Sequence, residues 1–314
     1  MLSKEIMGVL ALGILWVNTL LVAAAAWKEI AALAERRRRL ALIGEGEPGV
    51  GLVRAKLARG DGPGGALAVH RVEQVGRAGA EVDEKRTILF ADRGFSGEAF
   101  GGLARLEGGG SEITIEAAES AEVWLAADEI ARAAACPSDE AFDAAYETAR
   151  KARGHARTVG ATIEGERFVW LFGHLRRRGE GLSLSAPAGG SMLISTVDPH
   201  AWIGRKTTLA TLFIVLELAL AGACTAVALQ RPHFGLVSTL GGALCLGYFL
   251  LVQPAGVSLR EAMRAPSKAF LRGRWMRTSP GGPQEAPTKG NVRRISERAP
   301  ATSDSKRSPT VPAT

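Results

Sequence analysis

Hydrophobic positions in this chain gather into three long runs, at residues 6–27, 207–229 and 234–252. Each run has roughly the 20 residues that an α-helix needs to cross a hydrocarbon layer of about 30 Å. A helix buried in a soluble core is the alternative, but such helices are usually shorter and carry a polar stripe. The pattern therefore predicts three transmembrane α-helices.

Between the first and second runs the apolar residues form short stretches broken by glycine clusters, which is typical of strands and tight turns. A helix is expected to begin after Ser138, a good N-cap residue, and to end near residue 153. We therefore predict an α+β domain over residues 44–203, with one or two helices and a curved sheet or half-open barrel. The predicted strands cover residues 50–57, 66–75, 86–90, 112–116, 122–125, 158–163, 167–175, 182–186 and 192–195.

Basic residues gather after the first run and after the third, whereas the short loop between the second and third runs holds only Arg231. Because Lys and Arg near the end of a span stay cytoplasmic, we expect a multi-pass membrane protein whose middle domain and C-terminal tail both face the cytoplasm. The basic residues that we expect to face lipid headgroups are Arg36, Arg37, Arg38, Arg39, Arg272 and Arg274.

A cleaved signal peptide is the alternative interpretation of the first run, because residues 23–26 are small. The apolar part of a signal peptide usually has about 7 to 15 residues. This run is longer and is followed by a basic juxtamembrane segment at residues 28–43, which favours a retained anchor.

The net charge of +7 belongs to the C-terminal tail, since residues from 255 onward contain twelve Lys or Arg against four Asp or Glu. The rest of the chain is close to neutral, so the composition gives no support for a nucleic-acid partner. Basic and apolar residues alternate over residues 253–278, as in an interfacial helix on anionic lipid or in a merely solvated flank. Residues 279–314 are rich in Pro, Ser and Thr, and we expect them to be disordered.

Three segments of the middle domain, in this order, are similar to signature segments of one known family. Residues 64–72 resemble the first signature strand of the GIDE domain, or BAM (beside a membrane) domain, of membrane-anchored ubiquitin ligases and bacterial relatives. The matching positions in the other two segments are Phe90, Asp92 and Gly94 of a Phe-x-Asp-x-Gly turn, and Gly165 and Gly173 of a late strand–turn–strand. The resemblance covers residues 51–202 and implies a membrane-adjacent sensing or interaction module.

One departure from that family bears on activity. Its ligases follow the last span with a RING, which needs about eight Cys and His zinc ligands, yet this chain has neither residue type after position 252. Ubiquitin-ligase activity is therefore not expected, unless the RING is recruited from another chain. Cys224 and Cys245 lie in predicted spans and Cys136 is alone in the domain, so no disulfide is expected there.

Motifs for chemistry are scarce. The G-x-G-x-x-G string at residues 44–49 precedes a predicted strand instead of opening a helix, and its two glutamates would repel a pyrophosphate. The histidines of the domain, His70, His155, His174 and His200, lack the spacing of metal ligands. We assign no catalytic, cofactor-binding or metal-binding residue.

Glu217 lies in the middle of the second run, where a carboxylate is costly and must be protonated, paired or turned to the bundle interior. Asn18 lies at a similar depth in the first run, and we expect a hydrogen bond between the two. Such a bond would join helices within one chain or between copies in a homo-oligomer; a proton or ion relay is the alternative. The small-residue pairs Gly222 with Ala226 and Ser238 with Gly242 predict close helix packing.

The sequence thus favours a membrane-anchored, non-enzymatic interaction or sensing protein whose partners are anionic lipid headgroups and a protein or small ligand that it does not name. Two alternatives stay open. One is an enzyme, either a relative of the GIDE-type ligases or a hydrolase without a recognisable motif, and the other is a small transport element that uses Glu217.

Overall fold

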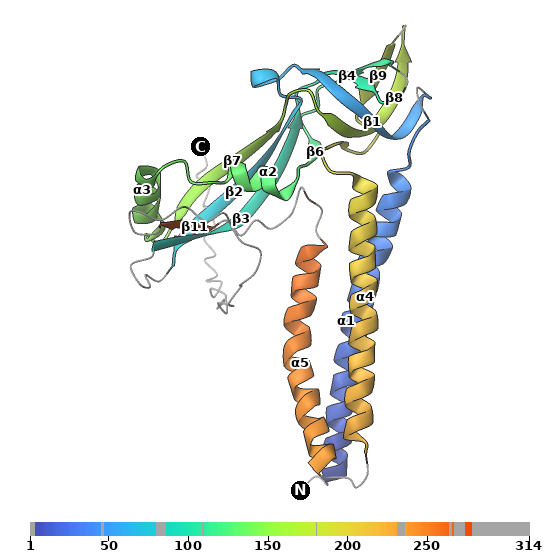
Figure 1. Ribbon diagram of the computed structural model, residues 1–314, viewed down its shortest axis with the longest axis vertical. Helices are drawn as coiled ribbons and strands as arrows, with labels where there is room; N and C mark the ends of the chain where they lie inside the picture. The colour runs from blue at the N-terminus through green and yellow to red at the C-terminus, as the bar shows by residue number, and fades with distance from the viewer. Residues whose placement is uncertain are drawn as a thin grey trace, which may run out of the picture.

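A bundle of long helices joins a β-rich domain in the computed structural model (Figure 1). The structure describes residues 4–44, 47–79, 86–108, 110–179, 181–230, 236–263, 266 and 274–277. The predicted disorder of residues 279–314, the loop around Arg231 and the lipid-facing position of Arg272 lie outside these residues.

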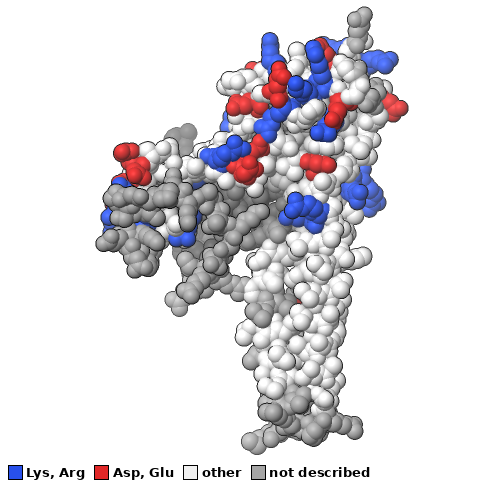
Figure 2. Space-filling view, viewed as in Figure 1, with Lys and Arg blue, Asp and Glu red and all other residues white. Residues whose placement is uncertain are grey.

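Three helices form the bundle, α1 (Lys4–Arg39), α4 (Pro199–Ala228) and α5 (Leu236–Ala262), and α4 runs antiparallel to the other two. Among the described helices, α1 from Val9 onward and the whole of α4 are long and apolar enough to cross a membrane. Both turn large apolar side chains outward, for example Val9 and Leu212, which are 70% and 62% exposed. The visible face of the bundle is almost free of charge, and Lys and Arg side chains gather where it meets the domain (Figure 2).

The helices run so that the domain and the end of α5 lie at the same end of the bundle (Figure 1). The third predicted span lies largely within α5. Of the basic segment at residues 253–278, for which an interfacial helix or a solvated flank was predicted, the residues up to Ala262 continue α5 and Arg274–Arg277 form a strand, β11. Residues 274–277 form a strand because they pair with a strand of the domain.

Five strands of the domain close into a small barrel. Around the barrel their order is β1–β4–β5–β9–β8 and back to β1, with β5 and β9 parallel and every other pair antiparallel. This connectivity is that of the partly open Greek-key barrel known as the OB fold. The strands are β1 (Gly49–Gly60), β4 (Gly102–Leu106), β5 (Glu112–Ile115), β8 (Phe168–Arg178) and β9 (Gly181–Ser185).

Two short strands extend the barrel toward the helices. β10 (Met192–Ser195) pairs with β8, and β6 (Ala121–Trp124) pairs with β10. Three residues after β10, Asp198 caps the start of α4. The extension therefore connects the barrel directly to the helical bundle.

A second, four-stranded sheet projects to one side of the barrel (Figure 1). Its order is β11–β3–β2–β7, all antiparallel. The connection between β1 and β4, a loop that binds ligands in many OB barrels, holds β2 and β3 here. Strands β2 (Ala68–Ala78), β3 (Arg86–Ala99), β7 (His155–Ile163) and β11 are accompanied by helices α2 (Ala127–Ala133) and α3 (Asp139–Ala149) and the short 3-10 helix η1 (Pro63–Gly65).

The main core fills the barrel and continues beneath the second sheet, with Leu57, Ile113 and Leu171 almost fully buried. A separate cluster lies between the barrel extension and the helices and is centred on Trp124, which is fully buried. The α+β class with a half-open barrel, predicted from the alternation of apolar residues, is confirmed. Ser138 also caps α3 as predicted, accepting a hydrogen bond from the Ala141 N–H at 3.2 Å.

Candidate juxtamembrane site

The end of α1 is clamped to the barrel extension. Arg36 forms an ion pair with Glu122 of β6, and its guanidinium lies 4.7 Å from the centre of the Trp124 ring. The Trp124 indole N–H donates to the same carboxylate at 2.9 Å, and the ring packs 5.2 Å from Trp202 of α4. The prediction that Arg36 faces lipid is therefore wrong, because its charge is used to hold the domain on the helix.

The start of α4 is tied to the end of α1 as well. Asp198 accepts hydrogen bonds from the backbone N–H groups of His200, at 2.8 Å, and Ala201, at 3.2 Å, as an N-cap residue does. The His200 imidazole donates through Nε2 to the backbone carbonyl of Leu40 at 2.8 Å. This bond holds the ring in one orientation at the junction of helices and domain.

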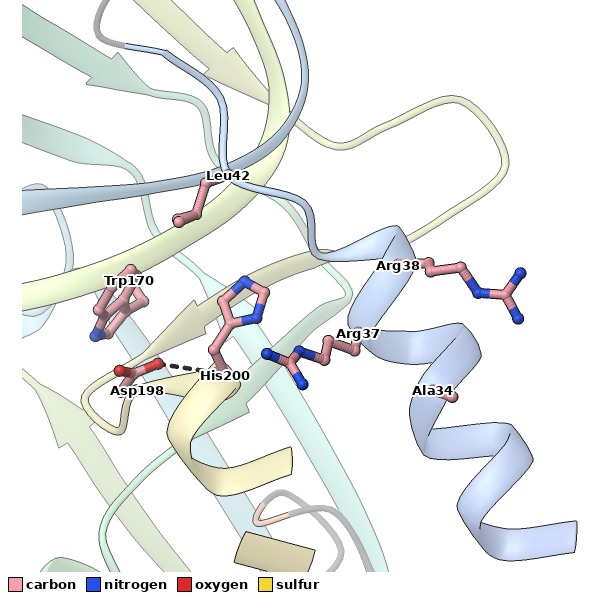
Figure 3. A pocket seen from close by; sticks show the side chains of 7 residues that line it. All are labelled: Ala34, Arg37, Arg38, Leu42, Trp170, Asp198 and His200. Carbon is pink, nitrogen blue, oxygen red and sulfur yellow. Dashed lines mark hydrogen bonds between the residues drawn. The ribbon is translucent and has the colours of Figure 1, made fainter. Parts of the chain in front are cut away.

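A hollow of about 660 Å³ opens at this junction (Figure 3). Arg37 extends from α1 toward His200, whereas Arg38 points away from both (Figure 3). Trp170 of β8 and Leu42 give the opposite side an apolar wall. The complete lining is Ala34, Arg37, Arg38, Leu42, Trp170, Asp198 and His200.

Charge in the hollow favours an anion. Arg38 and Arg39 both pair with Glu35, at 3.3 and 3.1 Å. Arg37 is exposed and has no ion-pair partner among the residues that the structure describes. The one acid of the lining, Asp198, uses Oδ1 for the helix cap, and the two arginines of the lining outnumber it, so the lining has a net positive charge.

The position of the hollow limits what can reach it. Arg37 lies ten residues beyond Trp27, the end of the first apolar run, which is about 15 Å along a helix. The hollow therefore lies beyond the apolar stretch of α1, where the helix surface is basic. None of the seven lining residues carries a hydroxyl or thiol group.

Trp170, Leu42 and the role of His200 were not predicted from the sequence. One local signal could have suggested the position of His200. Asp198 followed by Pro199 is a strong helix-start pattern just before an apolar run, and it places His200 in the first turn beside the membrane boundary. No comparable signal exists for Trp170, because only the pairing of β8 with β1 and β10 brings it near.

The positions of the family resemblance lie elsewhere, within the sheets. Asp92 accepts a hydrogen bond from Gln74 at 2.6 Å, and Gly94 lies opposite Glu73 on β2. Phe90 is buried in the cluster beneath α3. These residues stabilise the second sheet and do not line the hollow.

The two glycines of the late motif have separate structural reasons. Gly165 makes the turn between β7 and β8 with a φ of 74°, in the left-handed region that favours glycine. At Gly173, a Cβ atom would lie 2.5 Å from the carbonyl oxygen of Ser185, because β8 and β9 approach closely there. Both are positions of backbone geometry and carry no chemistry.

Within the bundle, Glu217 is 3% exposed, but the expected bond to Asn18 is absent. Neither carboxylate oxygen of Glu217 nor the amide nitrogen of Asn18 has a hydrogen-bond partner among the described residues. Tyr248 of α5 connects the helices instead, bonding Thr19 at 3.2 Å and donating to the backbone carbonyl of Glu217 at 3.3 Å.

The predicted small-residue pairs do not mark the closest helix contact. A Cβ at Gly222 or Gly242 would meet nothing within 4 Å. At Gly241 it would lie 2.7 Å from the backbone nitrogen of Ala228. The closest approach of α5 to α4 thus uses the neighbouring glycine.

The histidines of the domain stay apart, and no group of three or more potential metal ligands occurs in the described part of the chain. His70 is 2% exposed, and its burial lowers the pKa of the imidazole.

Compared with known proteins, the chain matches no family model, no curated protein and no solved structure.

Proposed function

We propose that the protein is a membrane-anchored binding protein without catalytic activity of its own, whose barrel domain is fixed beside the cytoplasmic face of the bilayer. The ligand of the juxtamembrane hollow is an anionic group of the phosphate class. The observation that carries the proposal is Arg37, a cation aimed into a hollow with His200 and without an ion pair in the described chain. Arg37 binds the anion beside the His200 ring, whose Nε2–H is used by the Leu40 carbonyl, and Trp170 packs against what carries it.

The membrane arrangement is part of the proposal. α1, α4 and α5 serve as three spans, and the domain and the tail lie on the same, cytoplasmic side. Two features support it: the end of α5 lies beside the domain (Figure 1), and the basic residues gather at that end of the bundle (Figure 2). The clamp of Arg36 with Glu122 then holds the hollow at a constant height above the lipid.

Relationship to the GIDE family also stays a proposal, supported by the placement of a β-rich domain between spans. A sensing or interaction role follows from it more readily than ligase activity, because the chain has no Cys or His after residue 252 from which a RING could be built.

Native mass spectrometry of the full chain, released from vesicles that contain neutral and anionic phospholipids, tests the proposal. We expect the wild type to retain anionic phospholipid, Arg37→Ala to lose most of it, and Arg39→Ala to bind like the wild type. The Arg39 variant is matched because that side chain is equally charged but paired with Glu35.

A second arm of the experiment distinguishes the source of the anion. Inorganic phosphate is titrated while the thermal unfolding of the same proteins is followed, since a ligand that binds only the folded state raises Tm. Stabilisation that depends on Arg37 without lipid retention identifies a soluble anion. If Arg37→Ala changes neither measurement, the hollow is not an anion site and the proposal is wrong.

A further inference from the structure

The short strand β11 completes the edge of the second sheet. It pairs antiparallel with the beginning of β3, with Trp275 opposite Ile88 and Arg277 opposite Arg86. In a strand, residues two apart point to the same face, so Trp275 and Arg277 share one face. Both reach toward helix α3 and the loop before it.

Trp275 fills a prepared site. Its ring centre lies 5.0 Å from that of Phe90, and the guanidinium of Arg157 lies 4.4 Å from the Trp275 ring and 3.5 Å from the Phe90 ring. The Trp275 indole N–H donates to the carbonyl of Ala134 at 2.8 Å. Arg157 donates to the same carbonyl at 3.0 Å and to Gln74 at 2.9 Å, so the domain itself holds the cation in place.

Arg277 is bound by charge. It forms an ion pair with Asp143 of α3, which also lies 4.0 Å from Arg86. Because Arg277 and Arg86 face each other across the strand pair, Asp143 is needed to offset their repulsion. The edge thus recognises two side chains, an aromatic residue with an N–H donor and an arginine two positions later.

We propose that this edge of β3 is a binding site for an extended peptide segment of the pattern Trp-x-Arg, and that β11 is its intramolecular occupant, displaced when a partner protein offers such a segment. Peptides commonly bind by adding a strand to a sheet edge, where backbone hydrogen bonds give affinity and pockets for alternate side chains give specificity. β11 has only four residues, which makes exchange feasible. The site is separate from the juxtamembrane hollow, so either proposal can fail alone.

The probe is a fluorescent synthetic peptide of residues 271–280, titrated onto the purified full chain while its anisotropy is measured. In the wild type the tethered strand has the advantage of a high effective concentration, and we expect weak binding. In the double variant Trp275→Ala with Arg277→Ala, we expect binding at least about tenfold tighter. Adding Asp143→Arg to this variant should abolish binding, and a peptide with glutamate at the position of Arg277 should restore it.

A peptide with alanine at the position of Trp275 should bind none of these proteins. Circular dichroism checks that each variant is folded; if the double variant is not, Arg277→Ala alone is used, because it leaves the apolar contact intact. Equal binding by the wild type and the opened variant, or binding that ignores Asp143→Arg, overturns the proposal. So does a wild-type dimer that dissociates on Trp275→Ala, since β11 would then be exchanged between copies.

Discussion

Arg36 of α1 forms an ion pair with Glu122 of β6, 86 positions away in the chain. The Trp124 indole N–H shares the carboxylate. This contact lies where α1 meets the domain and ties the barrel extension to the helix. The hollow between Arg37 and Trp170 lies beside it.

We expect Glu122→Ala to destabilise the docking of the domain by about 1–3 kcal/mol, because it leaves the partly buried Arg36 guanidinium and the Trp124 N–H without an acceptor. Hydrogen exchange of β6 and of the end of α1 measures the loss. Glu35→Ala is the control, since its pairs with Arg38 and Arg39 are exposed and should change stability by less than about 1 kcal/mol. Equal effects of the two variants would show that the clamp adds nothing.

Gly173→Ala should destabilise the barrel by about 1–3 kcal/mol, because the new methyl group meets the carbonyl oxygen of Ser185 at 2.5 Å. Gly160→Ala is the matched change in β7, where a Cβ has open space, and it should have little effect. Chemical denaturation of the full chain compares them. A neutral Gly173→Ala would mean that β8 and β9 separate easily at this point.

Glu217 offers a test inside the bundle. Its carboxyl group is buried without a hydrogen-bond partner in the described structure, and such a group is costly in a bilayer. We expect Glu217→Leu to stabilise the reconstituted protein and Tyr248→Phe to destabilise it by roughly 0.6 kcal/mol, the value of a typical interhelical hydrogen bond, since that hydroxyl bonds Thr19. If Glu217→Leu instead destabilises the bundle or changes its oligomeric state, the carboxyl group has a partner from another copy.

Stability should depend on pH through His70. Burial lowers the pKa of this imidazole in the folded chain below its ordinary value of 6.5, so the unfolded chain binds the proton more readily. The contribution is complete above about pH 6.5 and is lost as the pH falls from there through the folded pKa. His70→Phe should reduce the slope of the unfolding free energy with pH in this window. An unaltered slope in His70→Phe would assign the dependence to other groups, including His155, whose pKa burial also lowers.

The proposed orientation is tested with a reporter that is active only in the cytoplasm, fused after Gly160 and, separately, after Thr314. Activity at both positions is expected from the distribution of arginines. Silence at Gly160 would mean that the domain is exported and that its ligands are to be sought outside the cytoplasm.

Local patterns predicted most strands, because alternating apolar residues indicate a strand wherever one face is buried. They missed β4 (Gly102–Leu106) and α2 (Ala127–Ala133). β4 is only five residues long and starts between glycines, and α2 has a single fully buried side chain, Ile130. The two glycines at its start conceal the strand pattern of β4, and one buried side chain gives α2 no helical periodicity.

By itself the sequence determined which segments are apolar enough for long helices, which are strands, and that Ser138 starts a helix, since these depend on neighbours within a few residues. Only the tertiary structure decided which way Arg36 points, that Trp275 belongs to a strand on β3, and that Glu217 has no bond to Asn18. Each of these depends on partners far along the chain, and helix rotation or strand register selects those partners. The spacing of residues within one segment does not show which distant partners are selected.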